Sequence, residues 1–229
     1  MDTDEILNGL LDSLSNLTYI KEQDIPNIDL YMDQVTTFMD KRLRGTTRNP
    51  GDDKILTKTM INNYAKNNLL PSPEKKKYSK EHMLLLIFIY YFKNILSIND
   101  IQTLFKPITE EYFHNEGDYN LRDIYTEVFE MEKEGIPALK EDVIKKFRYA
   151  ETTFENAPEK DRDFLRKFAF ICLLSLDVFA KKMLIESMID EMRAKETKTG
   201  KNKEEAKAGK SKEEAKAGKT KEESSENKN

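Results

Sequence analysis

Apolar residues recur at intervals of three and four along most of the chain, which is the spacing of one face of an α-helix. Over residues 4–18 this pattern predicts an amphipathic lead-in helix that must dock on another element. A second helix is predicted over 29–43, with Asp29 as its candidate N-cap. The stretch 44–53 contains glycines, a proline and polar residues that cannot easily continue a helix, so it predicts a mobile loop or an insertion.

Thr57 is the candidate cap of a short helix with two different faces. Its apolar residues share the inward face: Met60, Ile61, Tyr64 and Ala65. Its polar and basic residues share the outward face: Lys58, Thr59, Asn62, Asn63 and Lys66. Because Tyr64 lies on the inward face, the pattern favours core packing of its ring over contact with a phosphate.

Pro71 and Pro73 then break the helix, and residues 74–78 form a basic turn with one tyrosine. Ser79 is the candidate cap of a helix over 82–96 that is apolar on nearly every side, which is typical of the central helix of a domain. Ser97 and Asp100 have the spacing of a capping box and predict one more helix, through Phe105.

Beyond Pro107 the sequence lacks the alternation of a strand, and three amphipathic segments are predicted near 108–115, 119–133 and 138–156. A longer helix over 160–193 is the strongest apolar element of this half, and it can serve as a domain core or as a dimer seam. The predicted fold class is therefore all-α.

The C-terminal segment, 195–229, has low complexity and a nine-residue period. The repeats read KNKEEAKAG at 201–209, KSKEEAKAG at 210–218 and the degenerate KTKEESSEN at 219–227. Since no apolar side chain here is larger than alanine, the segment cannot bury enough surface to offset its ordering entropy. It is predicted to be a disordered, solubilising or weakly interacting tail in which the glutamate and lysine spacing permits transient helix.

Composition and charge favour a soluble, cytoplasmic protein, since 38% of the 229 residues are hydrophobic, 35% are charged and one is cysteine. The net charge of −4 is strongly segregated. Residues 1–53 hold eleven acidic and five basic groups, a net of −6, whereas 57–82 hold six lysines and two glutamates, a net of +4. Residues 107–163 are acidic again, with sixteen carboxylates against eight basic groups, a net of −8. Contact with a nucleic acid is therefore expected only in the N-terminal half.

Three motifs in order, TMINNYAKNNLLP, KKYS and HMLLLIFIYYFKNILSINDIQTLF, resemble the DNA-binding domain of MerR-type regulators. Together with IPNIDLYMDQVTTFMDKRL, they resemble more closely the uncharacterised bacterial family called domain of unknown function 1836, over roughly Ile25 to Phe105. The resemblance implies a MerR-like winged helix-turn-helix. Asn62 and Asn63 stand where MerR-type proteins usually present arginine and tyrosine, and the 44–53 loop replaces a tight turn.

The candidate DNA-binding residues lie in two groups. The first is the outward helix face: Lys58, Thr59, Asn62, Asn63 and Lys66. The second is the turn: Lys75, Lys76, Lys77 and Tyr78. Exposed asparagines can pair with adenine in the major groove, and lysines between a proline and a tyrosine suit phosphate contact. The alternatives are ordinary surface amides, a solvated basic turn and a tyrosine packed in the core.

Catalysis and metal binding have little support in the sequence. His82 and His114 have no second ligand at metal-binding spacing, and Cys172 lies in an apolar helical run that favours a structural thiol over a nucleophile. No glycine-rich phosphate loop or nucleophile elbow is found, so neither an enzyme nor a cofactor is expected.

The sequence thus predicts a bacterial regulator in four parts: a lead-in helix (1–24), a MerR-like helix-turn-helix domain (25–106), a helical dimerisation or effector domain (107–194) and a tail (195–229). Its expected partners are duplex DNA and a second copy of the chain, without a membrane. The rival prediction is a protein-interaction module on the same scaffold that rejects DNA. A third is small-molecule binding without DNA, which requires a pocket that the sequence cannot reveal.

Overall fold

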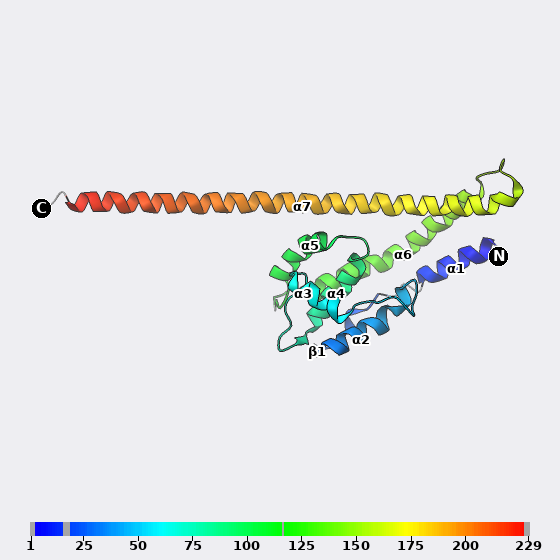
Figure 1. Cartoon of the computed structure of the whole chain (residues 1–229), viewed down its shortest axis with the longest axis horizontal. Coiled ribbons are helices and arrows are strands. Elements are labelled where there is room, and N and C mark those ends of the chain that lie inside the picture. Colours follow the sequence, from blue (N-terminus) through cyan, green and yellow to red (C-terminus); the bar gives the residue numbers. More distant parts are fainter. Residues whose placement is uncertain (1–2, 16–18, 116, 227–229) are drawn as a thin grey trace. The chain divides into compact units, whose positions relative to one another are not determined.

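The computed structural model describes residues 3–15, 19–115 and 117–226 (Figure 1). The elements follow in the order α1 (Thr3–Ser15), η1 (Glu22–Asp24), β1 (Leu30–Tyr31), α2 (Met32–Leu43), η2 (Arg44–Thr46), α3 (Lys58–Lys66), β2 (Lys77–Tyr78), α4 (Lys80–Phe92), α5 (Ile98–Glu111), α6 (Leu121–Glu151) and α7 (Glu159–Glu226). The strands have two residues each, so the predicted all-α class is confirmed. The chain divides into two units, Met1–Met183 and Leu184–Asn229.

Helix α4 is the centre of the first unit, as its apolar pattern predicts. Every residue from 81 to 90 is buried, and helices α5 and α6 both pack aromatic side chains on it. Phe88 contacts Phe105 of α5 (ring centroids 6.3 Å apart) and Tyr125 of α6 (5.4 Å). Burying each such side chain contributes about 1.5–3 kcal/mol, so this helix supplies much of the stability of the unit.

The helix starts follow the predicted caps except at α2. The Thr57 hydroxyl accepts from Met60 N at 3.1 Å, and Ser97 and Asp100 form the expected capping box, with Asp100 N donating to Ser97 Oγ at 3.2 Å. Helix α2 instead begins after Tyr31, whose backbone N–H donates to Gln34 Oε1 at 2.8 Å. The prediction of Asp29 as the cap is wrong, because Leu30 and Tyr31 pair with β2 as a strand before the helix starts.

Two prolines, Pro107 and Pro137, lie inside helices, although the sequence pattern predicts that a helix ends before each of them. Helix α5 continues through Pro107 to Glu111, and α6 runs unbroken through Pro137, in place of separate segments over 119–133 and 138–156. An internal proline costs about 3 kcal/mol or more through one lost hydrogen bond and a clash. In α6 buried residues lie on both sides of the proline, Leu121 and Tyr125 before it and Phe147 after it, and their burial at about 1.5–3 kcal/mol each offsets that cost.

A second hydrophobic cluster joins α1, the C-terminal half of α6 and the start of α7. It consists of Leu7, Val143, Phe147, Ala150 and Phe170. The Phe147 and Phe170 rings meet edge to face, with centroids 5.1 Å apart. The lead-in helix therefore docks on α6, as the sequence requires; residues 16–18 of its predicted span lie outside the described residues.

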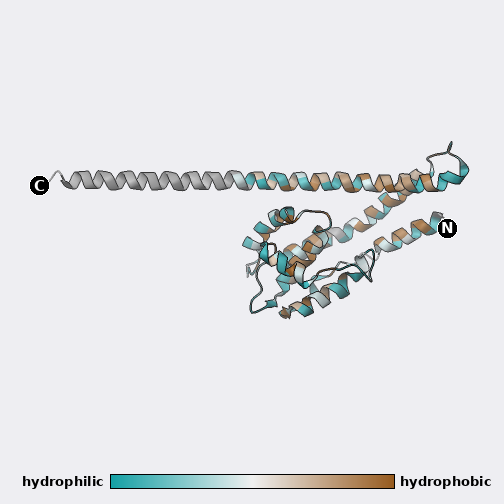
Figure 2. Ribbon diagram, in the orientation of Figure 1, coloured by the Kyte–Doolittle hydropathy of each residue, from teal (hydrophilic) through white to brown (hydrophobic). Residues whose placement is uncertain are grey.

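Helix α7 buries Phe170 and leaves a broad apolar band exposed. In the part of α7 that belongs to the first unit, seven large apolar side chains are 52–68% accessible: Phe164, Phe168, Ile171, Leu176, Val178, Phe179 and Met183. Figure 2 shows brown, hydrophobic positions interleaved with teal ones along this part of α7. Cys172 is exposed among them and forms no disulfide, and the choice of a structural thiol over a nucleophile stays a prediction.

The backbone of α7 continues as a helix through the repeats to Glu226, and residues 227–229 lie outside the described residues. The disorder of 195–229 in solution and the predicted domain boundaries stay predictions. No helix in the described part of the chain is both long and apolar enough to cross a bilayer.

Candidate nucleic-acid interface

Helix α3 presents the predicted polar and basic face. Ile61 and Tyr64 are buried on its inner side, and burial raises the pKa of the Tyr64 hydroxyl. The outward residues are all exposed: Lys58, Thr59, Asn62, Asn63 and Lys66. The core packing of Tyr64 is thereby confirmed.

The ends of α3 are fixed to the core on both sides. Before it, Ile55 and Leu56 are buried, and Lys93 Nζ at the end of α4 donates to the Ile55 carbonyl at 2.6 Å. Burial lowers the pKa of Lys93. After it, Asn68 takes a left-handed φ of 54°, which ends the helix, and Leu69 N donates to the Tyr64 carbonyl at 2.9 Å. A short helix held at both ends keeps its outward face in a fixed orientation.

The basic turn is a tight two-residue turn. Lys77 N donates to the Glu74 carbonyl at 2.8 Å, and the central residues Lys75 and Lys76 have φ values of 48° and 64°. Positive φ at both central positions defines a type I′ turn, which normally carries Asn-Gly or Gly-Gly. Two lysines therefore occupy strained positions, at a cost of about 1 kcal/mol each, and both side chains are exposed.

The next two residues, Lys77 and Tyr78, belong to strand β2 and pair antiparallel with Tyr31 and Leu30. The Lys77 amine lies 5.4 Å from the centre of the Tyr31 ring, at the exposed side of the strand pair. Tyr78 is 3% accessible, and burial raises the pKa of its hydroxyl. Tyr78 is therefore packed in the core, and its contact with DNA stays a prediction.

His82 stabilises the first turn of α4, which follows the basic turn in the chain. Ser79 N donates to His82 Nδ1 at 3.0 Å, and the ring meets Tyr78 edge to face with centroids 5.5 Å apart. Burial, assisted by the charge of His114, lowers the pKa of His82 to about 4. The carbonyls of Pro71 and Ser72 oppose this shift, although Nε2 has no hydrogen-bond partner among the described residues. The ring is therefore neutral at physiological pH.

Glu81 links the same helix start to the end of α5. Its carboxylate is 12% accessible and accepts from the backbone N–H of His114 at 3.0 Å and from His114 Nδ1 at 2.8 Å. The two contacts connect the segment after α5 to the first turn of α4. They thereby hold in place the helix start that directly follows strand β2.

An ion pair joins the first turn of α3 to an acidic group. Lys58 forms an exposed ion pair with Asp33 of α2, a contact that no local spacing in the sequence reveals. Such exposed pairs contribute about 0–1 kcal/mol, so a phosphate can replace the carboxylate at little cost. Asn62, Asn63 and Lys66 stay exposed, so helix α2 does not cover them.

The 44–53 loop folds on itself and on α4. Arg44 Nη1 donates to the carbonyls of Pro50 and Asp53, both at 2.7 Å. The Thr46 hydroxyl lies 2.6 Å from the Tyr90 hydroxyl of α4. These bonds give the loop defined contacts that its composition does not indicate.

The part of the chain that carries these residues is thus a helical domain in which α2 contacts both a short helix with an exposed polar face and an antiparallel strand pair that follows a basic turn. Residues 20–128, from the segment before η1 to the start of α6, match the protein family described as Domain of unknown function (DUF1836), which supports the resemblance to that family. No curated protein and no solved structure matches the chain. No group of three or more histidine, cysteine, aspartate or glutamate side chains in the described residues is placed to hold a metal ion.

Proposed function

We propose that the protein is a sequence-specific, double-stranded DNA-binding transcriptional regulator with a MerR-like winged helix-turn-helix. The observation that supports the proposal most directly is that α3 and the Lys75–Lys76 turn are both exposed, while helix α2 contacts both α3 and the adjoining strand β2. In this proposal α3 is the recognition helix and the turn is the tip of the wing.

The size and chemistry of α3 suit the major groove of B-DNA. An α-helix with its side chains is about 10–12 Å in diameter, which fits the groove width of about 12 Å. Asn62 and Asn63 can each donate and accept at the N6 and N7 edge of adenine, and each such pair is worth about 1–3 kcal/mol of discrimination. Lys58, Lys75, Lys76 and Lys77 supply positive charge for the phosphates, and Lys66 adds charge at the other end of α3.

The protein is expected to act as a homodimer, because helix-turn-helix proteins read two half-sites with two copies. The exposed apolar band of α7, residues 164–183, supports this expectation. Its seven exposed side chains are 52–68% accessible and include three phenylalanines, the residue type whose burial dominates interface energetics.

The same band favours one rival, a non-enzymatic protein-interaction module that does not bind DNA. An apolar surface of this size marks an interaction site whether the partner is a second copy or another protein. The two proposals differ at α3, because only a DNA reader needs Asn62 and Asn63 for base discrimination.

The test is selection of bound duplexes from a random library with the full chain, followed by fluorescence anisotropy at two salt concentrations. Asn62→Ala/Asn63→Ala is expected to weaken binding to the selected sequence by about 10-fold or more and to relax its preference at adenine positions. The matched control, Asn8→Ala/Asn27→Ala, removes two exposed asparagines outside α3 and is expected to leave binding unchanged. An unchanged preference in the α3 variant contradicts base reading, and no binding at low salt favours the interaction module.

A further inference from the structure

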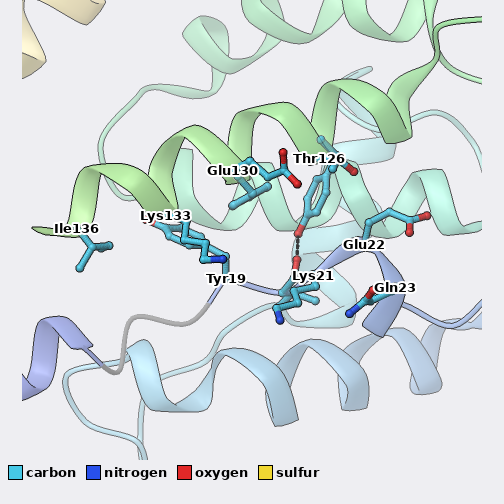
Figure 3. Close-up of a pocket in the computed structure, with 11 residues that line it drawn as sticks. Tyr19, Lys21, Glu22, Gln23, Thr126, Glu130, Lys133 and Ile136 are labelled. Atoms are coloured by element: carbon cyan, nitrogen blue, oxygen red, sulfur yellow. Dashed lines mark hydrogen bonds between the residues drawn. The ribbon is translucent and has the colours of Figure 1, made fainter.

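A pocket of about 520 Å³ lies between the segment that enters η1 and the first four turns of α6 (Figure 3). Its volume falls within the range of about 300–1,000 Å³ that is usual for small-molecule sites. The pocket is separate from α3 and from the basic turn, so it plays no part in the proposed contact with DNA.

The wall of the pocket is aromatic. Tyr19 packs on Phe129 with ring centroids 5.0 Å apart, and Phe129 packs on Tyr125 at 4.3 Å. The Tyr125 hydroxyl donates to the Ile20 carbonyl at 2.5 Å, the dashed line in Figure 3. This bond fixes the segment against α6 and uses the one proton that the hydroxyl could donate to a ligand. The wall therefore offers ring surfaces for an apolar body rather than donors for a polar one.

The rim of the pocket carries more free positive than negative charge. The exposed amines of Lys21 and Lys133 form no ion pair with another described side chain. Of the two rim carboxylates, Glu22 is committed to Lys80 at 2.6 Å, which leaves Glu130 as the free one. Figure 3 shows the Lys133 amine beside Tyr19, whereas the Glu130 carboxylate is drawn toward Thr126.

We propose that this pocket binds a small amphipathic carboxylic acid. The apolar body lies against Tyr19 and Phe129, and the carboxylate lies between Lys21 and Lys133, where it accepts charge-assisted hydrogen bonds. The alternative is a cationic ligand, which the aromatic rings and the Glu130 carboxylate would favour if the two lysines were absent. Because the rim has two free amines and one free carboxylate, its net charge favours an anionic ligand.

The test is isothermal titration calorimetry of the full chain with three probes of one shape: naphthalene carboxylate, the neutral naphthalene carboxamide and the cationic naphthylmethylamine. The carboxylate is expected to bind once per chain and about tenfold more tightly than the carboxamide, with the amine weakest. Lys133→Gln is expected to bring the carboxylate down to the affinity of the carboxamide. Glu130→Gln is expected to strengthen carboxylate binding several-fold.

Lys145→Gln is the matched control, because it removes an exposed lysine of α6 outside the pocket and should change nothing. All three substituted residues are solvent-exposed, so the variants are expected to fold, and thermal unfolding checks this. Tightest binding of the amine, equal binding of all three probes without an effect of Lys133→Gln, or no heat from any probe at millimolar concentration would each overturn the proposal. None of these outcomes bears on DNA binding, which is measured separately.

Discussion

Replacing Lys75 with asparagine and Lys76 with glycine is expected to make the protein more stable and its binding to DNA weaker. Both residues have positive φ, and the turn closes through the 2.8 Å bond from Lys77 N to the Glu74 carbonyl. Asn-Gly is the preferred pair for a turn with positive φ at both central positions. The two changes relieve strain and remove two charges at once, so stability and affinity should move in opposite directions.

The gain in stability follows from the backbone. Two strained positions at about 1 kcal/mol each are relieved, and the glycine returns about 0.5–1 kcal/mol to the unfolded chain as entropy. The free energy of unfolding should rise by about 1 kcal/mol, which for a chain of this size raises Tm by about 2–4 °C. Urea unfolding and calorimetry measure the two quantities.

The loss in binding follows from counterion release. If Lys58, Lys75, Lys76 and Lys77 each meet one phosphate in each half-site, a dimer makes about eight contacts and the variant keeps about four. Between about 50 and 200 mM salt, the affinity of the unsubstituted protein should fall by about 10⁴-fold and that of the variant by about 10²-fold. Fluorescence anisotropy with the selected duplex gives both slopes.

Lys75→Ala/Lys76→Ala is the matched control, since it removes the same charges but keeps a Cβ atom at both strained positions. It should lose DNA affinity as the Asn-Gly variant does, without the gain in stability. A stabilised Asn-Gly variant with unchanged salt dependence would refute phosphate contact by the turn. An Asn-Gly variant no more stable than the alanine pair would refute the turn geometry itself.

Two further predictions concern His82 and α7. Because the pKa of His82 is lowered from 6.5 to about 4, the unfolded chain gains a proton first as pH falls, and the protein should lose about 2 kcal/mol of stability between about pH 7.5 and pH 5. His82→Gln keeps an acceptor for Ser79 N, and its urea unfolding should lack this part of the pH dependence; an equal loss in the variant would exclude His82 as the source. In sedimentation at micromolar concentration, Phe168→Glu/Phe179→Glu should convert a dimer to monomer. Lys160→Glu/Lys181→Glu, which introduces two glutamates at exposed polar positions of the same helix, should remain dimeric. Loss of the dimer in this control would show that the exposed apolar band is not specifically required for dimerisation.

The sequence predicts those elements whose signals are local. The cap at Thr57, the inward Tyr64 and the capping box of Ser97 and Asp100 follow from residues within one or two turns of each other, and the structure confirms them. The burial of α4 follows from an unbroken apolar run. In these places the local preference and the final packing agree.

Features that depend on distant partners are absent from the sequence pattern. Helix α6 runs through Pro137 because it packs on α4 at one end and on α1 and α7 at the other, and neither contact can be seen in the residues around the proline. Asp29 fails as a cap because residues 30 and 31 pair with residues 77 and 78. Within the candidate interface, the outward face of α3 was predictable, whereas the left-handed turn, the buried Tyr78 and the Lys58–Asp33 pair were not.

The charge distribution limits what either proposed function can mean. Residues 57–82 carry a net charge of +4 between acidic stretches of −6 and −8, so the α3 face and the turn attract an anionic partner while most of the chain repels one. An acidic protein would satisfy that field as well as DNA does, and its binding would also weaken with salt. Salt dependence alone therefore does not distinguish the regulator from the interaction module. The loss of adenine preference in the Asn62→Ala/Asn63→Ala variant does distinguish them, because the two amides are uncharged and have a defined hydrogen-bonding match with adenine in the major groove.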